Sequence, residues 1–231
     1  MSAQRSEQPP EKITADTKTN YGRIAKVYEL GAYLGSNGQI QISKKHHLTL
    51  LKKPSRILYP GAGIGIEVAE AAKAGHDVTI VELNPGMLEA AKAYFREQGV
   101  EDKVTCILGS ILDHHGEYDV VVANYFLCVF DQQMMRTMFK HLTTLVKSDG
   151  LLCLSGYGPM HGSLAHKAIQ WANHEYANIF CVLVMNNAKH PIYDYEPLFD
   201  EMGVKKEYIH DFHHFGSFGP RFHRMWAVRK K

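Results

Sequence analysis

The stretch that most constrains the fold of this 231-residue chain runs from residue 56 to residue 84 and reads RILYPGAGIGIEVAEAAKAGHDVTIVELN. A short apolar run at 57–59 precedes a glycine-rich turn at 61–65. A segment with apolar residues at helical spacing follows, and Gly75 ends it before a second apolar run at 78–81. This pattern predicts a strand, a tight turn, a helix and a second strand, the unit that places parallel strands side by side.

The turn and the end of the second strand carry residues suited to binding a nucleoside. Gly61, Gly63 and Gly65 let the backbone turn sharply and approach a ligand closely, because no Cβ is in the way. Glu82 stands where the second strand should end, and a carboxylate there can accept hydrogen bonds from both hydroxyls of a ribose.

The spacing of the glycines distinguishes two families of cofactor. A dinucleotide site needs G-x-G-x-x-G, whereas this chain has G-x-G-x-G followed by Ile66. The pattern resembles motif I of the class I S-adenosylmethionine (SAM)-dependent methyltransferases, and Glu82 resembles their ribose-binding acid. One departure is that Tyr59 stands where the family usually has Asp or Glu. The resemblance implies a SAM site formed by Gly61, Ala62, Gly63, Gly65, Glu82 and Leu83.

Length and composition indicate one soluble α/β domain. The net charge of +2 and scattered basic pairs give no electrostatic case for nucleic acid. The four cysteines, at 106, 128, 153 and 181, lack close metal-ligand spacing and predict reduced thiols in a cytoplasmic protein. Residues 1–18 are polar and predict a disordered leader, and the longest apolar run, 179–185, is too short to span a membrane.

The rest of the chain continues the alternation of strands and helices. We expect strands at 104–108, 118–123, 151–154, 204–212 and 222–228, helices at 39–51, 85–95, 132–146 and 191–202, and a turn at 148–150. The predicted fold is a Rossmann-like α/β domain over residues 19–231. It has a seven-stranded, mostly parallel sheet with an antiparallel last strand, helices on both faces, and cap helices at the N-terminus and after the fifth strand.

The resemblance also implies cofactor contacts outside the glycine motif. Tyr21 and Tyr28 belong to an N-terminal helix similar to that of ubiquinone-pathway methyltransferases, and packing against the sheet is the alternative for both. The family often has Asp where this chain has Ser110, which can accept one hydrogen bond. The remaining implied contacts, at the starts or ends of predicted elements, are Met87, Ile111, Asn124 and Tyr125. Core packing for Met87 and turn formation for Asn124 are the alternatives.

The loop after the fifth strand lies at the edge of the sheet where ligands bind in open α/β folds. It carries Tyr157 and His161, our candidates for a catalytic base if the methyl acceptor is a hydroxyl. The apolar segment that follows, at about 160–190, predicts a lid over a planar or apolar acceptor, with Trp171 and Tyr176 as substrate contacts. The alternative for this segment is an ordinary packing helix.

Two alternative functions stay open on the sequence. The first is SAM binding without ordinary methyl transfer or SAM-dependent chemistry of another type, motivated by Tyr59 and Ser110. The second is a nicotinamide-dependent oxidoreductase, which the glycine spacing argues against. The spacing of His210, His213 and His214 also raises the question of a metal site. On a strand only His210 and His214 share a face, with no acid partner there, so we predict no metal.

Overall fold

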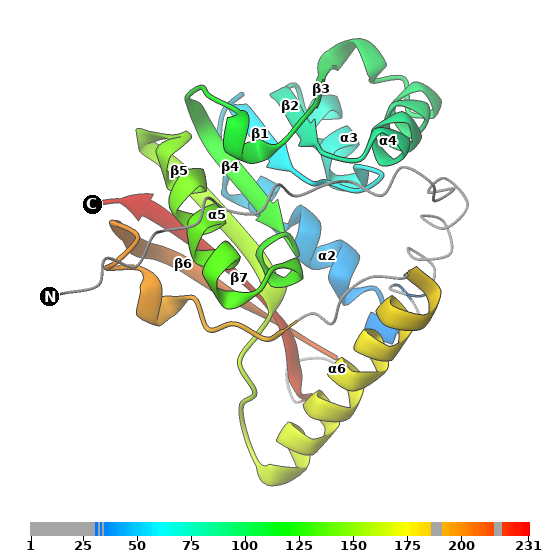
Figure 1. The fold of residues 1–231 in the computed structure, drawn as a ribbon, viewed down its shortest axis with the longest axis vertical. Helices are drawn as coiled ribbons and strands as arrows, with labels where there is room; N and C mark the ends of the chain where they lie inside the picture. The colour runs from blue at the N-terminus through cyan, green and yellow to red at the C-terminus, as the bar shows by residue number, and fades with distance from the viewer. Residues whose placement is uncertain (1–30, 32, 34, 186–190, 215–218) are drawn as a thin grey trace, which may run out of the picture.

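The computed structural model describes residues 31, 33, 35–185, 191–214 and 219–231. Within them, the chain forms a seven-stranded sheet in the order β3-β2-β1-β4-β5-β7-β6 (Figure 1). The strands are β1 (Arg56–Pro60), β2 (Asp77–Glu82), β3 (Val104–Leu108), β4 (Tyr118–Asn124), β5 (Val146–Tyr157), β6 (Val204–His213) and β7 (Arg221–Lys230). Strand β7 runs antiparallel to both β5 and β6, and the pairs from β3 to β5 are parallel. The predicted fold is confirmed.

Helices cover both faces of the sheet. They are α2 (Gln39–Lys45), α3 (Ile66–Lys73), α4 (Pro85–Glu97), α5 (Gln132–Thr144) and α6 (Leu164–Met185). Short 3-10 turns are η1 (His46–Leu50), η2 (Glu101–Lys103), η3 (Ile111–Asp113), η4 (Leu127–Val129) and η5 (Glu196–Leu198). One apolar core lies between α5 and the sheet, and a second lies between the sheet and α3 with α4. Helix α6 extends outward beyond the carboxyl ends of β4 and β5 (Figure 1).

Local sequence explains where two of these helices begin. The side chain of Asn84 accepts a hydrogen bond from the backbone N–H of Met87, and Pro85 occupies the first helical position of α4. Asp131 caps α5 in the same way through the N–H of Met134. Both caps follow strand ends, so each helix starts at the carboxyl edge and packs back along the sheet.

The turn predicted at 148–150 and the helix predicted before it both differ in the structure. The turn predicted at 148–150 is part of β5, because Tyr118 pairs with Val146 while Val120 pairs with Leu151, and the extra residues form an irregularity in the ladder. Gly150 permits this crowded path, since a Cβ there would lie 2.7 Å from Cγ1 of Val146. The helix predicted at 132–146 accordingly ends at Thr144.

The prediction of a helix at 191–202 was wrong. Only the 3-10 turn η5 forms there, followed by turns up to Gly203. Pro197 has no N–H to donate, so a regular helix running through 191–202 would lose a hydrogen bond in its interior. Tyr195, Phe199 and Met202 are nonetheless buried at helix-like spacing, which explains why the sequence suggested a helix.

Candidate active site

The glycine-rich turn between β1 and α3 has the backbone that its sequence predicts. Gly61, Gly63 and Gly65 have φ values of 57°, 61° and 74°, in the left-handed region that favours glycine. The N–H of Gly61 donates to the carbonyl of Val81 (2.9 Å), and the N–H of Gly65 donates to the carbonyl of Ala62 (3.1 Å). These bonds fix the turn against the end of β2.

The three glycines differ in what a side chain at each position would meet. A Cβ at Gly61 would lie 2.9 Å from Cδ2 of Phe126, and one at Gly65 would lie 2.6 Å from Cζ of Phe95. A Cβ at Gly63 would meet no atom of the described residues within 4 Å. Gly61 and Gly65 are therefore required by packing inside the protein, whereas Gly63 faces open space that a ligand can enter.

Glu82 ends β2 beside this turn. Its Oε1 accepts a hydrogen bond from the backbone N–H of Asn84 (2.8 Å). Burial raises the pKa of this carboxyl above its ordinary value, while the backbone N–H groups of Asn84 and Leu83 act in the opposite direction. The carboxylate is thus oriented by the backbone, and its second oxygen makes it a suitable acceptor for the hydroxyls of a ribose.

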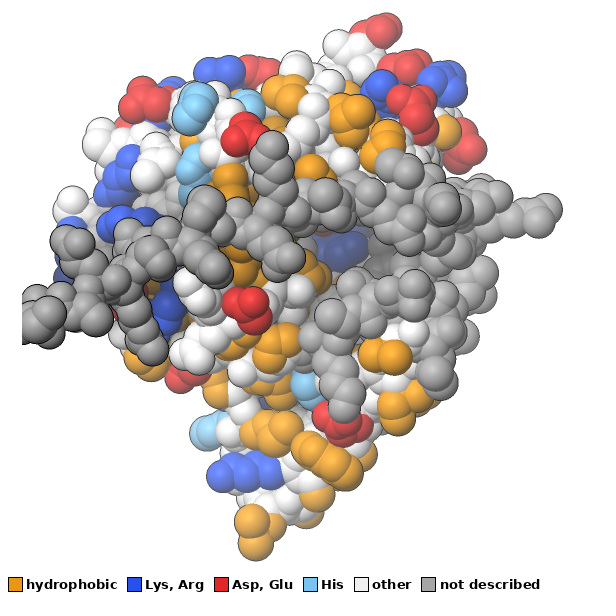
Figure 2. Space-filling model, viewed as in Figure 1, with side chains coloured by type: hydrophobic (Ala, Val, Ile, Leu, Met, Phe, Trp, Pro, Cys, Tyr) orange, Lys and Arg blue, Asp and Glu red, His pale blue; other side chains and the backbone are white. Residues whose placement is uncertain are grey.

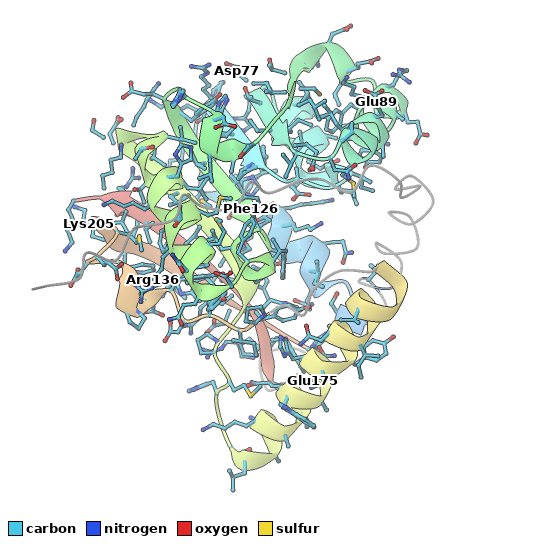
Figure 3. The ribbon with its side chains drawn as sticks, in the orientation of Figure 1. Asp77, Glu89, Phe126, Arg136, Glu175 and Lys205 are labelled. Atoms are coloured by element: carbon cyan, nitrogen blue, oxygen red, sulfur yellow. The ribbon has the colours of Figure 1, made fainter. Side chains whose placement is uncertain are left out.

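A cavity of about 210 Å³ opens next to Glu82. Most of its lining is apolar, and Phe126, labelled near the middle of Figure 3, closes it just beyond the end of β4. The lining residues are Gly61, Val81, Glu82, Leu83, Gly109, Ser110, Ile111, Phe126, Val129, Phe130 and Met138. An apolar slot with aromatic walls beside a carboxylate suits the flat base and the ribose of a nucleoside.

Several predicted cofactor contacts meet in this cavity, namely Gly61, Glu82, Leu83, Ser110 and Ile111. The hydroxyl of Ser110 caps η3 by accepting a hydrogen bond from the N–H of Leu112 (3.2 Å). Ala62 and Met87 lie outside the lining, and the N–H of Met87 serves the Asn84 cap. Tyr21 and Tyr28 lie outside the described residues.

The end of β1 carries a neutral pair in place of an acid. The hydroxyl of Tyr59 lies 2.7 Å from Nε2 of His47, and Nδ1 of His47 lies 2.9 Å from the carbonyl oxygen of Lys44. Burial lowers the pKa of His47 to about 3 and raises the pKa of Tyr59 well above its ordinary value. Neither group is charged at neutral pH, so β1 presents no carboxylate to a ligand.

Asn124 ends β4 and is held from two sides. Its Nδ2 donates to the carbonyl of Lys44 in α2 (2.8 Å) and to Oε1 of Glu67 in α3 (3.2 Å). The next residue, Tyr125, has a φ of 52°, a conformation that costs a non-glycine residue about 1–2 kcal/mol. Its hydroxyl is hydrogen-bonded to Ser43 (2.8 Å). Backbone strain of this kind is concentrated at functional sites.

Aromatic and imidazole rings gather at the end of β5 and the start of β7. The ring centroid of Tyr157 lies 5.9 Å from that of Tyr125, 4.9 Å from that of His174 and 5.4 Å from that of His223. Burial lowers the pKa of His223 to about 3, so this ring is neutral. We call Tyr125, Tyr157, His174 and His223 the ring cluster; it offers flat apolar surfaces beside Asn124.

The structure brings Tyr157, but not the side chain of His161, into the ring cluster. His161 is exposed, and its backbone N–H and carbonyl are hydrogen-bonded to the side chain of Gln170 (2.8 and 3.2 Å). This exchange ties the loop after β5 to α6.

Helix α6 buries polar residues and exposes apolar ones. Gln170, His174 and Asn178, spaced by four, face inward. Trp171 and Tyr176, the predicted substrate contacts, are 58% and 56% exposed. Figure 2 shows hydrophobic side chains along the outer surface of this helix. Trp171 and Tyr176 therefore lie apart from the ring cluster in this conformation.

Sequence reasoning missed several residues of the site. Phe126, Phe130 and Met138 wall the cavity, and Glu67 contacts Asn124. His174 and His223 join the ring cluster from α6 and β7. For two of them, the position in the sequence was the one available signal. Phe126 directly follows Asn124 and Tyr125, and Glu67 follows the glycine turn.

The described part of the chain contains no group of three or more metal-ligating side chains, His210 and His214 included. Among its helices, none has the length and apolar character needed to cross a membrane.

Comparison with known proteins places this site in a family context. Residues 57–150 match the family model for a methyltransferase domain. This match covers the glycine turn, Glu82, the cavity and Asn124. None of the curated proteins compared with the sequence matches it.

Solved methyltransferases share the fold. The mitomycin 7-O-methyltransferase is 15% identical with a TM-score of 0.64, and the alignment covers 92% of this chain and 61% of that one. The magnesium protoporphyrin IX methyltransferase of Synechocystis PCC 6803, with bound S-adenosylhomocysteine (SAH), is 16% identical with a TM-score of 0.58, covering 94% and 90%. The 1,6-didemethyltoxoflavin-N1-methyltransferase of Burkholderia thailandensis, also with SAH, is 15% identical with a TM-score of 0.59, covering 95% and 93%. The chain thus spans about three fifths of the first of these proteins and nearly all of the other two.

Proposed function

We propose that this chain, which carries a class I SAM-dependent methyltransferase domain, transfers the methyl group of SAM to an O, N, S or C atom of a small molecule. The observations that carry the proposal are the open face of Gly63 in the glycine turn and the apolar cavity lined by Gly61 and Glu82. The other proposed SAM contacts include Ala62, Met87, Tyr21 and Tyr28.

The residues present fit SAM in their chemistry. The cavity offers apolar walls for a base, Glu82 offers a carboxylate for ribose hydroxyls, and Gly63 leaves space for close approach of the ligand. When bound, SAM supplies an electrophilic methyl group on a positively charged sulfur.

The protein's own part is to hold an acceptor in line with that methyl group. Such positioning can contribute up to roughly 7–11 kcal/mol in favourable cases. We propose that the ring cluster provides the acceptor surface, because its rings, which include Tyr125 next to Asn124, can stack on a flat acceptor. For a hydroxyl acceptor, Tyr157 and His161 are the proposed proton acceptors, and Tyr157 is the one inside the cluster.

Features of the chain and its relatives support a small, planar or apolar acceptor. The solved relatives described above act on mitomycin, magnesium protoporphyrin IX and 1,6-didemethyltoxoflavin. The ring cluster supplies stacking surfaces for a flat molecule. A net charge of +2 gives nucleic acid no electrostatic advantage. We also propose a cytoplasmic location, supported by the buried thiol of Cys153, which forms no disulfide within the described residues.

Calorimetry with SAM, SAH and NADH tests the cofactor, and SAH formation across a panel of small acceptors tests the transfer. We expect SAM and SAH to bind and NADH not to bind. Binding of NADH without SAM would overturn the proposal. Gly63→Val is the matched control, because it fills the open face of the turn and should abolish both binding and SAH formation.

One observation favours a second candidate, a protein that binds SAM without ordinary methyl transfer. The end of β1 carries neutral Tyr59 paired with His47, and Ser110 uses its hydroxyl to cap η3. SAM binding with no product from any acceptor in the panel would favour this candidate.

A further inference from the structure

Beside the glycine turn lies a buried carboxylate that has no cationic partner among the described residues. Glu67 lies in the first turn of α3, two residues after Gly65, and is 1% exposed. Its Oε1 accepts a hydrogen bond from Nδ2 of Asn124, but its Oε2 is buried with no hydrogen-bond partner in the described part of the chain. None of the salt bridges found among those residues includes Glu67.

The side-chain oxygen of Asn124 is a second buried acceptor that receives no hydrogen bond in the described part of the chain. Its Nδ2 donates to both Lys44 and Glu67, so the orientation of the amide is fixed. Its Oδ1 is buried and, within the described ranges, accepts no hydrogen bond. The hydroxyl of Ser155, which pairs in register with Asn124 on β5, is likewise buried and unpartnered there. Buried acceptors are normally satisfied, so this group of atoms indicates a missing donor.

The described part of the fold does not supply that donor. The positive pole of α3 favours a negative charge in its first turn, but it leaves the lone pairs of Oε2 unused. The hydroxyl of Tyr59 is close enough for the charge of Glu67 to raise its pKa, yet it is hydrogen-bonded to His47. Glu67 is thus a carboxylate near the end of β1, where the strand itself carries a neutral tyrosine.

We propose that Glu67 Oε2 and Asn124 Oδ1 bind the α-ammonium group of the methionine part of SAM. This inference rests on the proposed function. A primary ammonium group carries three N–H donors and a positive charge, so it satisfies two orphaned acceptors and compensates the buried carboxylate together. A neutral hydroxyl or amide would leave the charge uncompensated.

This assignment divides the ligand between two sides of the glycine turn. The base and ribose lie in the cavity beside Glu82, and the amino-acid end lies between α3 and the end of β4. The sulfur between them is then close to Asn124, next to the ring cluster. Helix α2 covers the ammonium site through the carbonyl of Lys44.

The binding of two nucleosides distinguishes the contributions of the two halves of the site. SAH has the amino-acid end, and 5′-methylthioadenosine lacks it. For Glu67→Gln we expect SAH affinity by calorimetry to fall by roughly 10- to 100-fold, because a hydrogen bond to a charged group is lost. The affinity for 5′-methylthioadenosine should stay the same. Glu70→Gln, on the same helix with a partly exposed side chain, is the matched control and should change neither affinity. Asn124→Ala is a second variant that should show the same selectivity for SAH.

Melting temperatures give an independent readout. Because Glu67 is buried without a cation, free Glu67→Gln should melt at the wild-type temperature or above, while the stabilisation caused by saturating SAH shrinks. Equal losses for both nucleosides, unchanged SAH affinity, or a free variant that melts well below wild type would overturn the proposal and give Glu67 a structural role. If the wild type binds neither nucleoside, the proposed function fails as well, and that result is distinct from a failure of the Glu67 assignment alone.

Discussion

The hydroxyl oxygen of Tyr59 lies 2.7 Å from Nε2 of His47, and both side chains are fully buried at the end of β1. This contact joins the sheet to η1, so the strand end that faces the ligand edge is also an anchor for α2 and η1 above it. We interpret Tyr59 as a structural residue rather than a cofactor ligand.

Tyr59→Phe should therefore destabilise the fold with little effect on SAM affinity. Removing the hydroxyl leaves a buried imidazole nitrogen without its partner, which costs about 1–3 kcal/mol. Urea unfolding measures the loss and calorimetry measures the affinity. Unchanged stability with weakened SAM binding would instead make Tyr59 a ligand.

Stability should fall as the solution is acidified from about pH 6.5 towards pH 3. Burial lowers the pKa values of His47 and His223 from an ordinary 6.5 to about 3. Each of these histidines therefore binds a proton in the unfolded chain, but not in the folded one, between these pH values, and acid favours unfolding. The pKa values of four further histidines are lowered in the same direction, those of His46, His76, His114 and His214.

His223→Phe should reduce this acid dependence. The slope of unfolding free energy against pH decreases by up to about 1.4 kcal/mol per pH unit for each such histidine removed. At pH 7.5 the variant should keep its stability, because neither ring nitrogen of His223 has a hydrogen-bond partner among the described residues. Urea unfolding at a series of pH values tests this, and an undiminished slope would contradict it.

Gly63→Ala and Gly65→Ala should affect different properties. Both residues have positive φ, so each alanine costs about 1–2 kcal/mol through backbone strain. The Gly65 variant also forces a Cβ to within 2.6 Å of the Phe95 ring, and it should lose much more stability. The Gly63 variant should remain folded and bind SAM more weakly, because its methyl group enters the open face. Thermal melting and calorimetry on both variants test the contrast, and equal behaviour would remove it.

Glu82→Ala should weaken SAM binding while leaving the fold intact. Loss of hydrogen bonds to a charged group costs about 1.5–3 kcal/mol of binding free energy. Because burial raises the pKa of Glu82, the affinity of the wild type should also begin to fall at a higher pH than for an ordinary carboxylate. Calorimetry at neutral and acidic pH measures both effects. An alanine variant with wild-type affinity would exclude Glu82 from the site.

Local patterns predicted the fold well, since β1, α3 and β2 follow from apolar periodicity and glycine placement. The caps at Asn84 and Asp131 are equally local, because the capping side chain and the N–H that donates to it lie within one turn. One failure arose where a distant neighbour decided the outcome. Residues 148–150 look like a turn by composition, yet pairing with β4 holds them in β5.

The site shows the same division. The left-handed glycines and Glu82 could be predicted because motif spacing fixes them. The contacts of Glu67 with Asn124, and of His47 with Tyr59, join residues from different elements, and no periodicity indicates them. The orientation of α6 also eluded prediction, because a helix rich in aromatic residues is normally expected to bury them, and this one buries Gln170, His174 and Asn178.

That orientation decides what Trp171→Ala should do. If Trp171 belonged to the core, its loss would cost roughly 3–5 kcal/mol and every activity would suffer alike. Its side chain is 58% exposed, so we expect a change in stability within about 0.5 kcal/mol and unchanged SAM affinity. If α6 is a lid that selects the acceptor, turnover or acceptor preference should nevertheless change.

Two further variants test which face of α6 selects the methyl acceptor. Ile169→Ala, also on the exposed face, is the control and should leave acceptor preference unchanged. His174→Ala removes an inward ring 4.9 Å from Tyr157 and tests the ring cluster directly. A preference that shifts with Trp171→Ala supports the lid, since Trp171 reaches the acceptor only if α6 moves. A preference that shifts with His174→Ala alone places selection on the inward face. A large fall in melting temperature of Trp171→Ala, with SAM affinity lost in parallel, would contradict both.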